Sequence, residues 1–231
     1  RDTLTKEGII TRVFPMPISV KYPIEINNVY PGDKSFNSFL PNFLNNHYVR
    51  EYVYDIDYVD WFLEYSGLKA VTLKNVGEIA GTIITKPYTV NVCDDILHSR
   101  YVDMLSIHKK YRGQNYAGLL MSHAIKSTSD YLYRTYIFKI ENQTLPFNHI
   151  CKSKYYVYDV NKLVDSNPLY SVSHSRDEDL EYIHQLYTRE SVNYKCYPIF
   201  DEEQKKYIFT SRNGVYESLI IKVDDVPKGV V

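Results

Sequence analysis

Residues 102–121 read VDMLSIHKKYRGQNYAGLLM, and the periodicity of this stretch changes halfway along it. Residues 102–107 form a short, mostly apolar run with β-branched residues at both ends, which predicts a buried strand. Within residues 115–125, apolar side chains recur at helical spacing, which predicts a helix packed by one face. The sequence therefore predicts a strand that runs through a polar turn directly into a helix.

The turn between these two elements is basic. It comprises His108, Lys109, Lys110, Arg112, Gly113 and Gln114. The first N–H groups of a helix lack intrahelical partners and the helix dipole adds positive charge there, so this turn is a candidate anion site. Gly113 would let the backbone approach a bulky group such as a pyrophosphate. A solvated turn is the simpler interpretation for at least one of Lys109 and Lys110.

The composition is that of a globular protein, with 44% hydrophobic and 24% charged residues in a chain of 231 residues. The net charge of −1 provides no basic field for nucleic acid, and no apolar run reaches transmembrane length. The three cysteines and seven histidines show no metal-ligand spacing, so we expect no metal site, reduced thiols and a cytoplasmic location. The 24 tyrosines and only 9 glycines suggest an AT-rich genome such as that of a virus, which would place the protein in host cytoplasm or a virion.

The predicted elements follow the order β–α–α–β–β–β–α–β–α–β, a mixed α/β layout that ends near Leu163. The predicted strands are residues 22–30, 68–73, 79–85 (resuming after Pro87 at 89–92), 101–107, 133–140 and 155–160. The predicted helices are residues 36–46 capped by Ser35, 57–65 capped by Asp57, 115–129, and a helical turn at 149–154.

After residues 166–168 a similar order begins again, with a strand at 169–173, helices at 177–189 and 201–209, and a strand at 215–223. We therefore divide the chain into an N-terminal arm (1–21), an α/β domain (22–165) and a partial second repeat (166–231). A C-terminal extension packed on a single domain is the alternative interpretation. An incomplete sheet would leave an open edge, which a partner chain would cover.

Arg112, Asn115 and Ala117 fit the pattern R-x-x-N-x-A, which resembles the acyl-CoA-binding loop of the GNAT superfamily, Q/R-x-x-G-x-G/A. Within that superfamily, MLSIHKKYRGQNYAGLL is similar to a strand–loop–helix segment of the N-myristoyltransferase family, and LYSVSHSRDEDLEYIHQLYTRE resembles the start of that family's second repeat. The resemblance implies a GNAT-like acyl-CoA N-acyltransferase fold followed by a partial second GNAT-like repeat. It also implies transfer of a long acyl chain from myristoyl-CoA, the co-substrate, to the N-terminal glycine amine of a protein.

The resemblance further implies contacts to acyl-CoA from the strand end, the loop and the first helical turn. These contacts fall on Ser106, Ile107, His108, Lys110, Arg112, Gly113, Gln114, Asn115, Tyr116 and Ala117. The backbone N–H groups of Met104 and Leu105, freed by a bulge in the strand, would stabilise the oxyanion. Asp103 falls where the family has an Asn near the reacting amine, and a carboxylate there would hold or deprotonate an ammonium. Core packing for Met104 and Leu105, and a turn or salt bridge for Asp103, are the alternatives.

The sequence also departs from the family pattern. The family's main base is the carboxylate of its own C-terminus, which this sequence ends too early to supply, and the acidic loop that receives the peptide is shortened between Val49 and Tyr54. Two functional interpretations therefore stay open: an N-myristoyltransferase-like enzyme, and a catalytically degenerate module with a structural or assembly role, for example in a virion. A GNAT enzyme that acts on a small amine with acetyl-CoA is a third.

Overall fold

The computed structural model describes residues 24–48, 53–130, 132–139, 169–212 and 214–230. The chain divides into two compact units. The first contains the described residues up to Val90 and those from Asp95 to Lys139; the second contains the short segment Asn91–Asp94 and the described residues from Leu169 onward. The predicted arm at 1–21, the helical turn at 149–154 and the strand at 155–160 lie outside the described residues.

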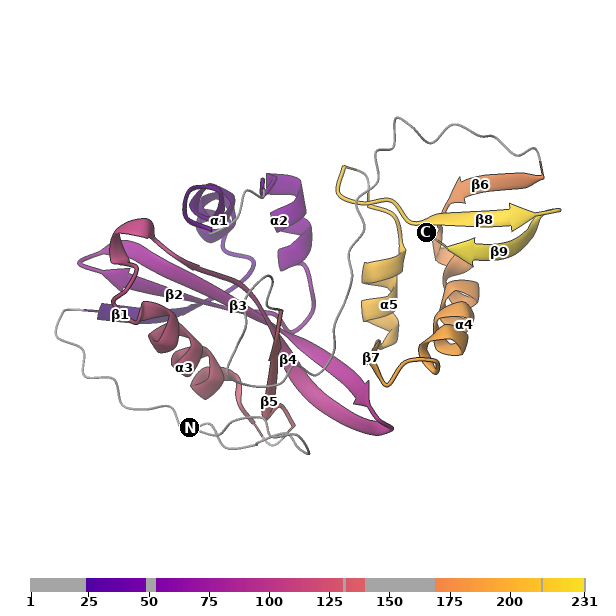
Figure 1. Cartoon of the computed structure of the whole chain (residues 1–231). Coiled ribbons are helices and arrows are strands. Elements are labelled where there is room, and N and C mark those ends of the chain that lie inside the picture. The colour runs from indigo at the N-terminus through magenta and orange to yellow at the C-terminus, as the bar shows by residue number, and fades with distance from the viewer. Residues whose placement is uncertain (1–23, 49–52, 131, 140–168, 213, 231) are drawn as a thin grey trace. The chain divides into compact units, whose positions relative to one another are not determined.

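A mixed sheet forms the centre of the first unit, in agreement with the predicted α/β layout (Figure 1). Its strands are β1 (Ile24–Val29), β2 (Lys69–Asn75), β3 (Glu78–Val92), β4 (Asp95–Ile107) and β5 (Thr135–Phe138), in that order across the sheet. β1 pairs antiparallel with β2 and β2 pairs antiparallel with β3, whereas β4 and β5 are parallel. A parallel pair needs a crossover connection, and α3 (Tyr116–Thr128) provides it.

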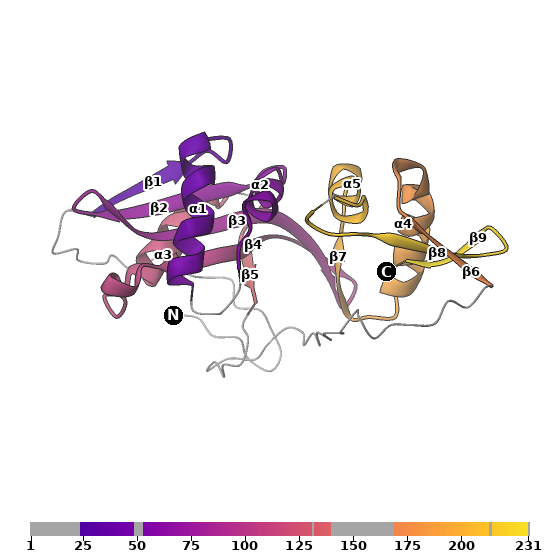
Figure 2. The same ribbon diagram turned by 90° about the horizontal axis from the view of Figure 1, so that it is seen from above.

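Two helices cover one face of this sheet and α3 covers the other (Figures 1 and 2). They are α1 (Lys34–His47) and α2 (Ile56–Leu63). The predicted caps Ser35 and Asp57 are wrong, because an aspartate two residues earlier caps each helix. The Asp33 carboxylate accepts from the Ser35 N–H at 2.9 Å, and the Asp55 carboxylate accepts from the Asp57 N–H at 2.8 Å.

Strand β3 continues through Pro87, so the predicted break in this strand is wrong. The proline ring lies against Gly67, where an added Cβ would come within 2.7 Å of the Pro87 Cγ. The Pro87 carbonyl accepts a hydrogen bond from the Tyr65 hydroxyl at 3.3 Å. A glycine beside the ring and a side-chain donor on the carbonyl therefore accommodate the proline within the strand.

The hydrophobic core of the first unit includes a cluster between the sheet and α3. Its buried members are Val71, Leu73, Ala80, Ile83, Tyr111, Tyr116, Leu120 and Ala124. Gly81 permits the close approach of β3 to its neighbours, because an added Cβ would lie 2.7 Å from Ile107 Cδ1 and 2.8 Å from Leu120 Cδ1. The same Cβ would lie 3.1 Å from the Ser106 carbonyl oxygen. The core therefore depends on the absence of a side chain at this position.

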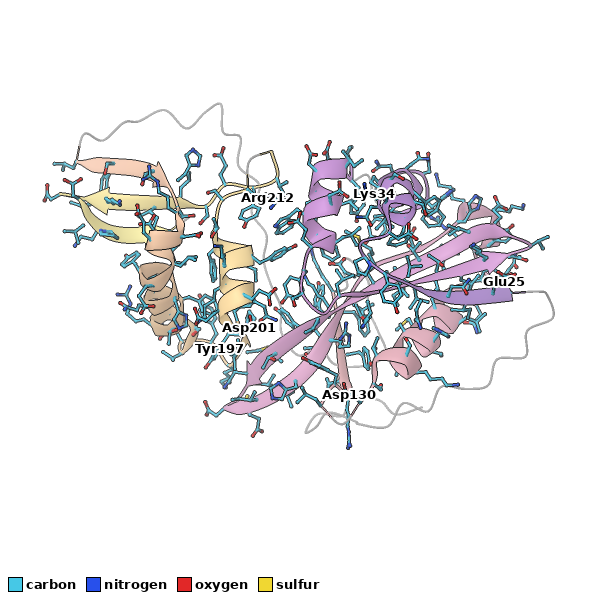
Figure 3. All side chains as sticks on the ribbon, turned by 180° about the vertical axis from the view of Figure 1, so that it is seen from behind. Glu25, Lys34, Asp130, Tyr197, Asp201 and Arg212 are labelled. Carbon is cyan, nitrogen blue, oxygen red and sulfur yellow. The ribbon has the colours of Figure 1, made fainter. Side chains whose placement is uncertain are left out.

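The second unit contains the predicted strand–helix–helix–strand order and two further strands. Its elements are β6 (Tyr170–His174), the 3₁₀ helix η3 (Asp177–Asp179), α4 (Leu180–Ser191), β7 (Cys196–Ile199), α5 (Glu202–Phe209), β8 (Leu219–Val223) and β9 (Val226–Val230). Asp201, labelled in Figure 3, caps α5 by accepting from the Gln204 N–H at 2.8 Å. Three strands form a sheet in the order β6-β8-β9, and β9 follows β8 through Asp224 and Asp225, whose φ values are +51° and +59°. The sequence analysis misses β7 and β9, which are short.

None of the helices in the described ranges is long and apolar enough to cross a membrane.

Gly81→Ala should destabilise the protein by about 1–3 kcal/mol, because the added methyl group overpacks the core against a main-chain oxygen. Gly32→Ala is the matched control, since a Cβ at Gly32 would meet nothing within 4 Å. Its free energy of unfolding should stay within about 0.5 kcal/mol of wild type. Urea denaturation followed by circular dichroism measures both variants, and equal stabilities would contradict the close packing described at Gly81.

Candidate functional site

The backbone of strand β4 is irregular at Met104, and this point is called the β4 break. This residue has a φ of +48°, in the left-handed region that non-glycine residues rarely adopt. The side chains also change face there. Val102 and Leu105 both pack against the core cluster that includes α3, although residues three apart point to opposite faces of a regular strand. The irregularity predicted at Met104 is therefore present, but the Met104 N–H is not free as predicted, because it donates to Asp103.

Two side chains bind the peptide groups of Met104. Its N–H donates to Asp103 Oδ1 at 2.8 Å, and its carbonyl accepts from the Thr82 hydroxyl at 3.3 Å. Met104 is itself buried. A left-handed non-glycine conformation costs about 1–3 kcal/mol, so these bonds and this packing stabilise a backbone geometry that the residue would not adopt alone.

A cleft of about 540 Å³ begins next to this break and ends at the first turn of α3. Its walls come from the end of β4, from the loop that contains the 3₁₀ helix η1 (Lys109–Tyr111), and from α3. The lining residues are Leu105, Ser106, Ile107, Tyr111, Arg112, Gly113, Asn115, Tyr116 and Ala117. The cleft has the size of a small-molecule or cofactor site.

The α3 end of the cleft presents a helix N-terminus. Asn115 is the N-cap, with a φ of +61°, and its side chain makes no capping hydrogen bond. Gly113 has a φ of +78°, which a glycine adopts without strain. Because the first N–H groups of a helix and the helix dipole both favour negative charge, this end of the cleft suits a phosphate or pyrophosphate group.

Arg112 fastens the loop to the end of α1. Its Nη2 donates to the carbonyl of His47, the last residue of α1, and its Nε donates to the Ile107 carbonyl at 3.3 Å. The His47 ring packs on the His108 ring with 3.9 Å between centroids. Arg112 therefore lines the cleft while it binds two main-chain oxygens, a structural role that the sequence analysis did not predict.

The other two cationic or imidazole side chains predicted to contact acyl-CoA are bound to neighbours. Lys110 Nζ lies 3.3 Å from Glu78 Oε2, and His108 Nδ1 accepts from the Lys110 N–H at 3.1 Å. The Tyr111 hydroxyl donates to the same Glu78 oxygen at 2.6 Å. Together the bonds from Tyr111 and Lys110 hold the pKa of Glu78 below its ordinary value.

The cleft brings most of the predicted acyl-CoA contacts together. Those that line it are Ser106, Ile107, Arg112, Gly113, Asn115, Tyr116 and Ala117. His108, Lys110 and Gln114 are not among its lining residues. Tyr111 is a lining residue that the sequence analysis missed, and its ring stacks on that of Tyr116 at 5.9 Å. Among the residues that the structure describes, no group of His, Cys, Asp and Glu side chains could hold a metal ion.

Asp103 lies beside the break, in a cluster of titratable side chains. Burial raises the pKa of Asp103, whereas the hydrogen bond from Met104 and the charge of Lys86 lower it. Burial raises the pKa of Tyr58 to about 12, and the charge of Asp103 adds to this rise. Burial lowers the pKa of Lys86, and Asp103 opposes that shift. The sequence analysis did not identify Lys86, because nothing local marks a lysine that lies between two predicted strand segments, 79–85 and 89–92.

No protein-family model matches the sequence, and no curated protein matches it. Solved structures do match. A Saccharomyces cerevisiae N-myristoyltransferase with bound myristoyl-CoA has a TM-score of 0.75 and 13% identity, with 97% of this chain and 66% of that chain covered. A second structure of that enzyme, with bound myristoyl-CoA and inhibitors, has a TM-score of 0.75 and 14% identity, and covers 99% of this chain and 63% of the other. An Enterococcus faecalis protein described as a probable N-acyltransferase has a TM-score of 0.56 and 10% identity, and covers 90% of this chain and 54% of the other.

These similarities establish the fold. The predicted GNAT-like N-acyltransferase fold, with the resemblance to N-myristoyltransferase, is confirmed at the level of structure. The chain spans just under two thirds of the length of the N-myristoyltransferase chains that it matches.

Arg112→Ala should lower the free energy of unfolding by about 0.5–1.5 kcal/mol, because two main-chain carbonyls lose a charged donor. Lys109→Ala is the matched control: Lys109 is an exposed residue of the same loop, and its loss should change stability by less than about 0.5 kcal/mol. Chemical denaturation of both variants tests this. If Arg112→Ala were as stable as Lys109→Ala, Arg112 would not fasten the loop to α1.

Proposed function

We propose that the protein is an acyl-CoA-dependent N-acyltransferase that transfers a long acyl chain, such as myristoyl, to the N-terminal glycine amine of a protein. The observation that carries this proposal is the position of the β4 break at the head of a cleft that ends at the α3 N-terminus. The likeness to N-myristoyltransferase structures with bound myristoyl-CoA supports the same assignment.

The two ends of the cleft suit the two ends of an acyl-CoA. The α3 N-terminus would take the pyrophosphate, and the segment from Leu105 to Ile107 would take the pantetheine arm. The thioester carbonyl would then lie at the break, where the N–H groups of Met104 and Leu105 would stabilise the oxyanion. The Met104 N–H is bound to Asp103 in the free protein, so the oxyanion would have to compete with that carboxylate for it.

In this proposal, Asp103 receives the proton of the acceptor amine. An N-terminal amine has a pKa of about 8, so near neutral pH it is mostly an ammonium that must lose one proton before it attacks. The Asp103 carboxylate is directly beside the break, and its charge would also attract the ammonium. This arrangement would supply a base from within β4 itself.

The alternative is a catalytically degenerate module that keeps the fold for a structural or assembly role. The internal bonds of Arg112 and Lys110 favour it, because these side chains are the ones best suited to bind CoA phosphates. Single-turnover transfer separates the two functions. With myristoyl-CoA and a glycine-initiated peptide, we expect stoichiometric amide formation, whereas its absence from a protein that binds myristoyl-CoA would support the degenerate module.

Ala117→Asp should weaken binding of myristoyl-CoA by at least about tenfold, because a carboxylate would enter the cleft and repel the pyrophosphate. Ser127→Asp is the matched control, since it adds the same charge near the other end of α3, outside the cleft lining. Isothermal titration calorimetry measures both variants. Failure of the folded wild type to bind myristoyl-CoA would refute the proposed function, and tighter binding of acetyl-CoA would favour a small-amine GNAT activity.

A further inference from the structure

Lys86 on β3 occupies an aromatic enclosure. Its Nζ lies 4.8 Å from the ring centroid of Phe62 and 4.9 Å from that of Tyr65, which come from α2 and the segment after it. A third ring, Tyr101 of β4, lies 5.8 Å away. The Lys86 side chain is half-buried, so its ammonium group loses part of its hydration. The faces of these rings offset part of that desolvation cost.

Asp103 shares a strand face with Tyr101. The two residues are two positions apart and precede the break, so they point to the same side of β4, opposite to Val102, which packs on the α3 side. The ring of Tyr101 is one of those that enclose Lys86. Lys86 and Asp103 are close enough that each shifts the pKa of the other toward its charged form.

The charge of Asp103 reaches tyrosines just before α2 and within α2, and a tyrosine at the end of α1 packs on the first of these. The ring centroid of Tyr54 lies 5.6 Å from that of Tyr48 and 6.3 Å from that of Tyr58. The charge of Asp103 raises the pKa of both Tyr54 and Tyr58, although burial is the larger cause. Lys139 is a further charged group whose field reaches Asp103. All of these tyrosines are half-buried, so the cluster retains contact with solvent.

The irregularity at Met104 shifts the alternation of side chains along β4, so this cluster and the cleft lie on opposite faces of the sheet. Leu105 and Ile107 pack toward the core cluster beside α3, whereas Asp103 lies on the face that carries Lys86 and α2. The peptide groups between Asp103 and Leu105 therefore lie between two chemically different environments. One has a helix N-terminus for an anion, and the other has a carboxylate and aromatic rings for a cation.

We propose that this cluster is the acceptor-amine subsite, in which Asp103 takes the proton of a primary ammonium and Lys86 is the positioning residue whose charge favours the ionised Asp103 carboxylate. The proposal rests on the proposed function and names a residue and a subsite that it does not require. Its ligand class is a primary ammonium on a flexible chain end, bound by one carboxylate and by tyrosine faces.

The ammonium R–NH₃⁺ gives one proton to the Asp103 carboxylate, and the neutral nitrogen attacks the thioester carbonyl carbon to form the C–N bond. The C–S bond breaks, its electron pair leaves on the CoA sulfur, and the second proton of the nitrogen neutralises that thiolate. The proton on Asp103 then passes to water. As Asp103 becomes neutral, its hydrogen bond from the Met104 N–H loses charge assistance, so this donor turns more readily to the oxyanion.

Lys86→Met tests the proposal through the titration of Asp103. Burial raises the pKa of Asp103 and the Lys86 ammonium opposes that rise, so removal of the ammonium should raise the midpoint of the Asp103 carboxyl further, by about one to three pH units. Carbon-detected NMR on the full chain with labelled aspartate measures this without any activity. Lys34→Met is the matched control, because Lys34 is an exposed lysine at the start of α1 (Figure 3), and the Asp103 midpoint should not move.

The acid limb of kcat/KM for a glycine-initiated peptide should move to higher pH by the same amount in Lys86→Met, and Lys86→Arg should restore it. An unchanged NMR midpoint, or an acid limb that does not move, would overturn the role of Lys86. If Lys86→Met does not fold, Asp103→Asn decides instead: it keeps an oxygen acceptor for the Met104 N–H but takes no proton. Its transfer rate at neutral pH should fall by about 100-fold or more and recover above the pKa of the amine, with myristoyl-CoA affinity unchanged.

Absence of myristoyl-CoA binding by the wild type refutes the proposed function, whatever the Asp103 titration gives. Binding and transfer by the wild type, together with full activity of Asp103→Asn at neutral pH, refute the role of Asp103 and the acceptor-amine subsite but not acyl transfer itself.

Discussion

The architecture of the first unit depends on one backbone constraint, the left-handed conformation of Met104 within β4. A regular strand would place Leu105 and Ile107 on the face opposite to Val102, and the core beside α3 would lose two apolar side chains. The Asp103 carboxylate and the Thr82 hydroxyl bind the peptide groups of Met104, and the buried methionine side chain fixes the rest. The loop, α3 and the residues that line the cleft all come after Met104 in the sequence. Their positions therefore depend on the irregular backbone at this residue.

The sequence predicts elements well where periodicity is long and apolar. The strand, basic loop and helix around α3 appear as expected, because Leu120 and its neighbours must face a core. Predictions that depend on one or two residues fail more often. Asp33 and Asp55 cap their helices in place of Ser35 and Asp57, since each helix begins earlier than predicted and the N–H groups of Ser35 and Asp57 are themselves capped. Pro87 does not end β3, because the glycine that accommodates its ring is twenty residues away in the sequence.

In the candidate site, too, some features were predictable from the sequence and others were not. Residues that share the loop and the first turn of α3 were predictable from their spacing, because a strand–loop–helix segment brings them together by itself. The hydrogen-bond partners of those residues were not predictable from the sequence. Arg112 binds the carbonyl of His47, and Tyr111 binds Glu78, which is a neighbour only after β3 and β4 have formed. Lys86 could not be identified from the sequence either, because the aromatic rings around it come from α2 and β4, which meet β3 only in the folded protein.

Lys86 and Asp103 are poorly explained by stability alone. Removing a charge from water costs several kcal/mol, and a cation over aromatic rings regains about 0.5–2 kcal/mol, so a methionine or leucine at position 86 would pack on Phe62 and Tyr65 at lower cost. What the pair does provide is a carboxylate whose ionised form is favoured by the charge of Lys86, against the burial that raises the pKa of Asp103. That carboxylate is bonded to the N–H of the single left-handed residue in β4. Protonation of Asp103 would weaken this bond, so under the proposed mechanism the Met104 peptide group would respond to the base and would also be the group that binds the oxyanion.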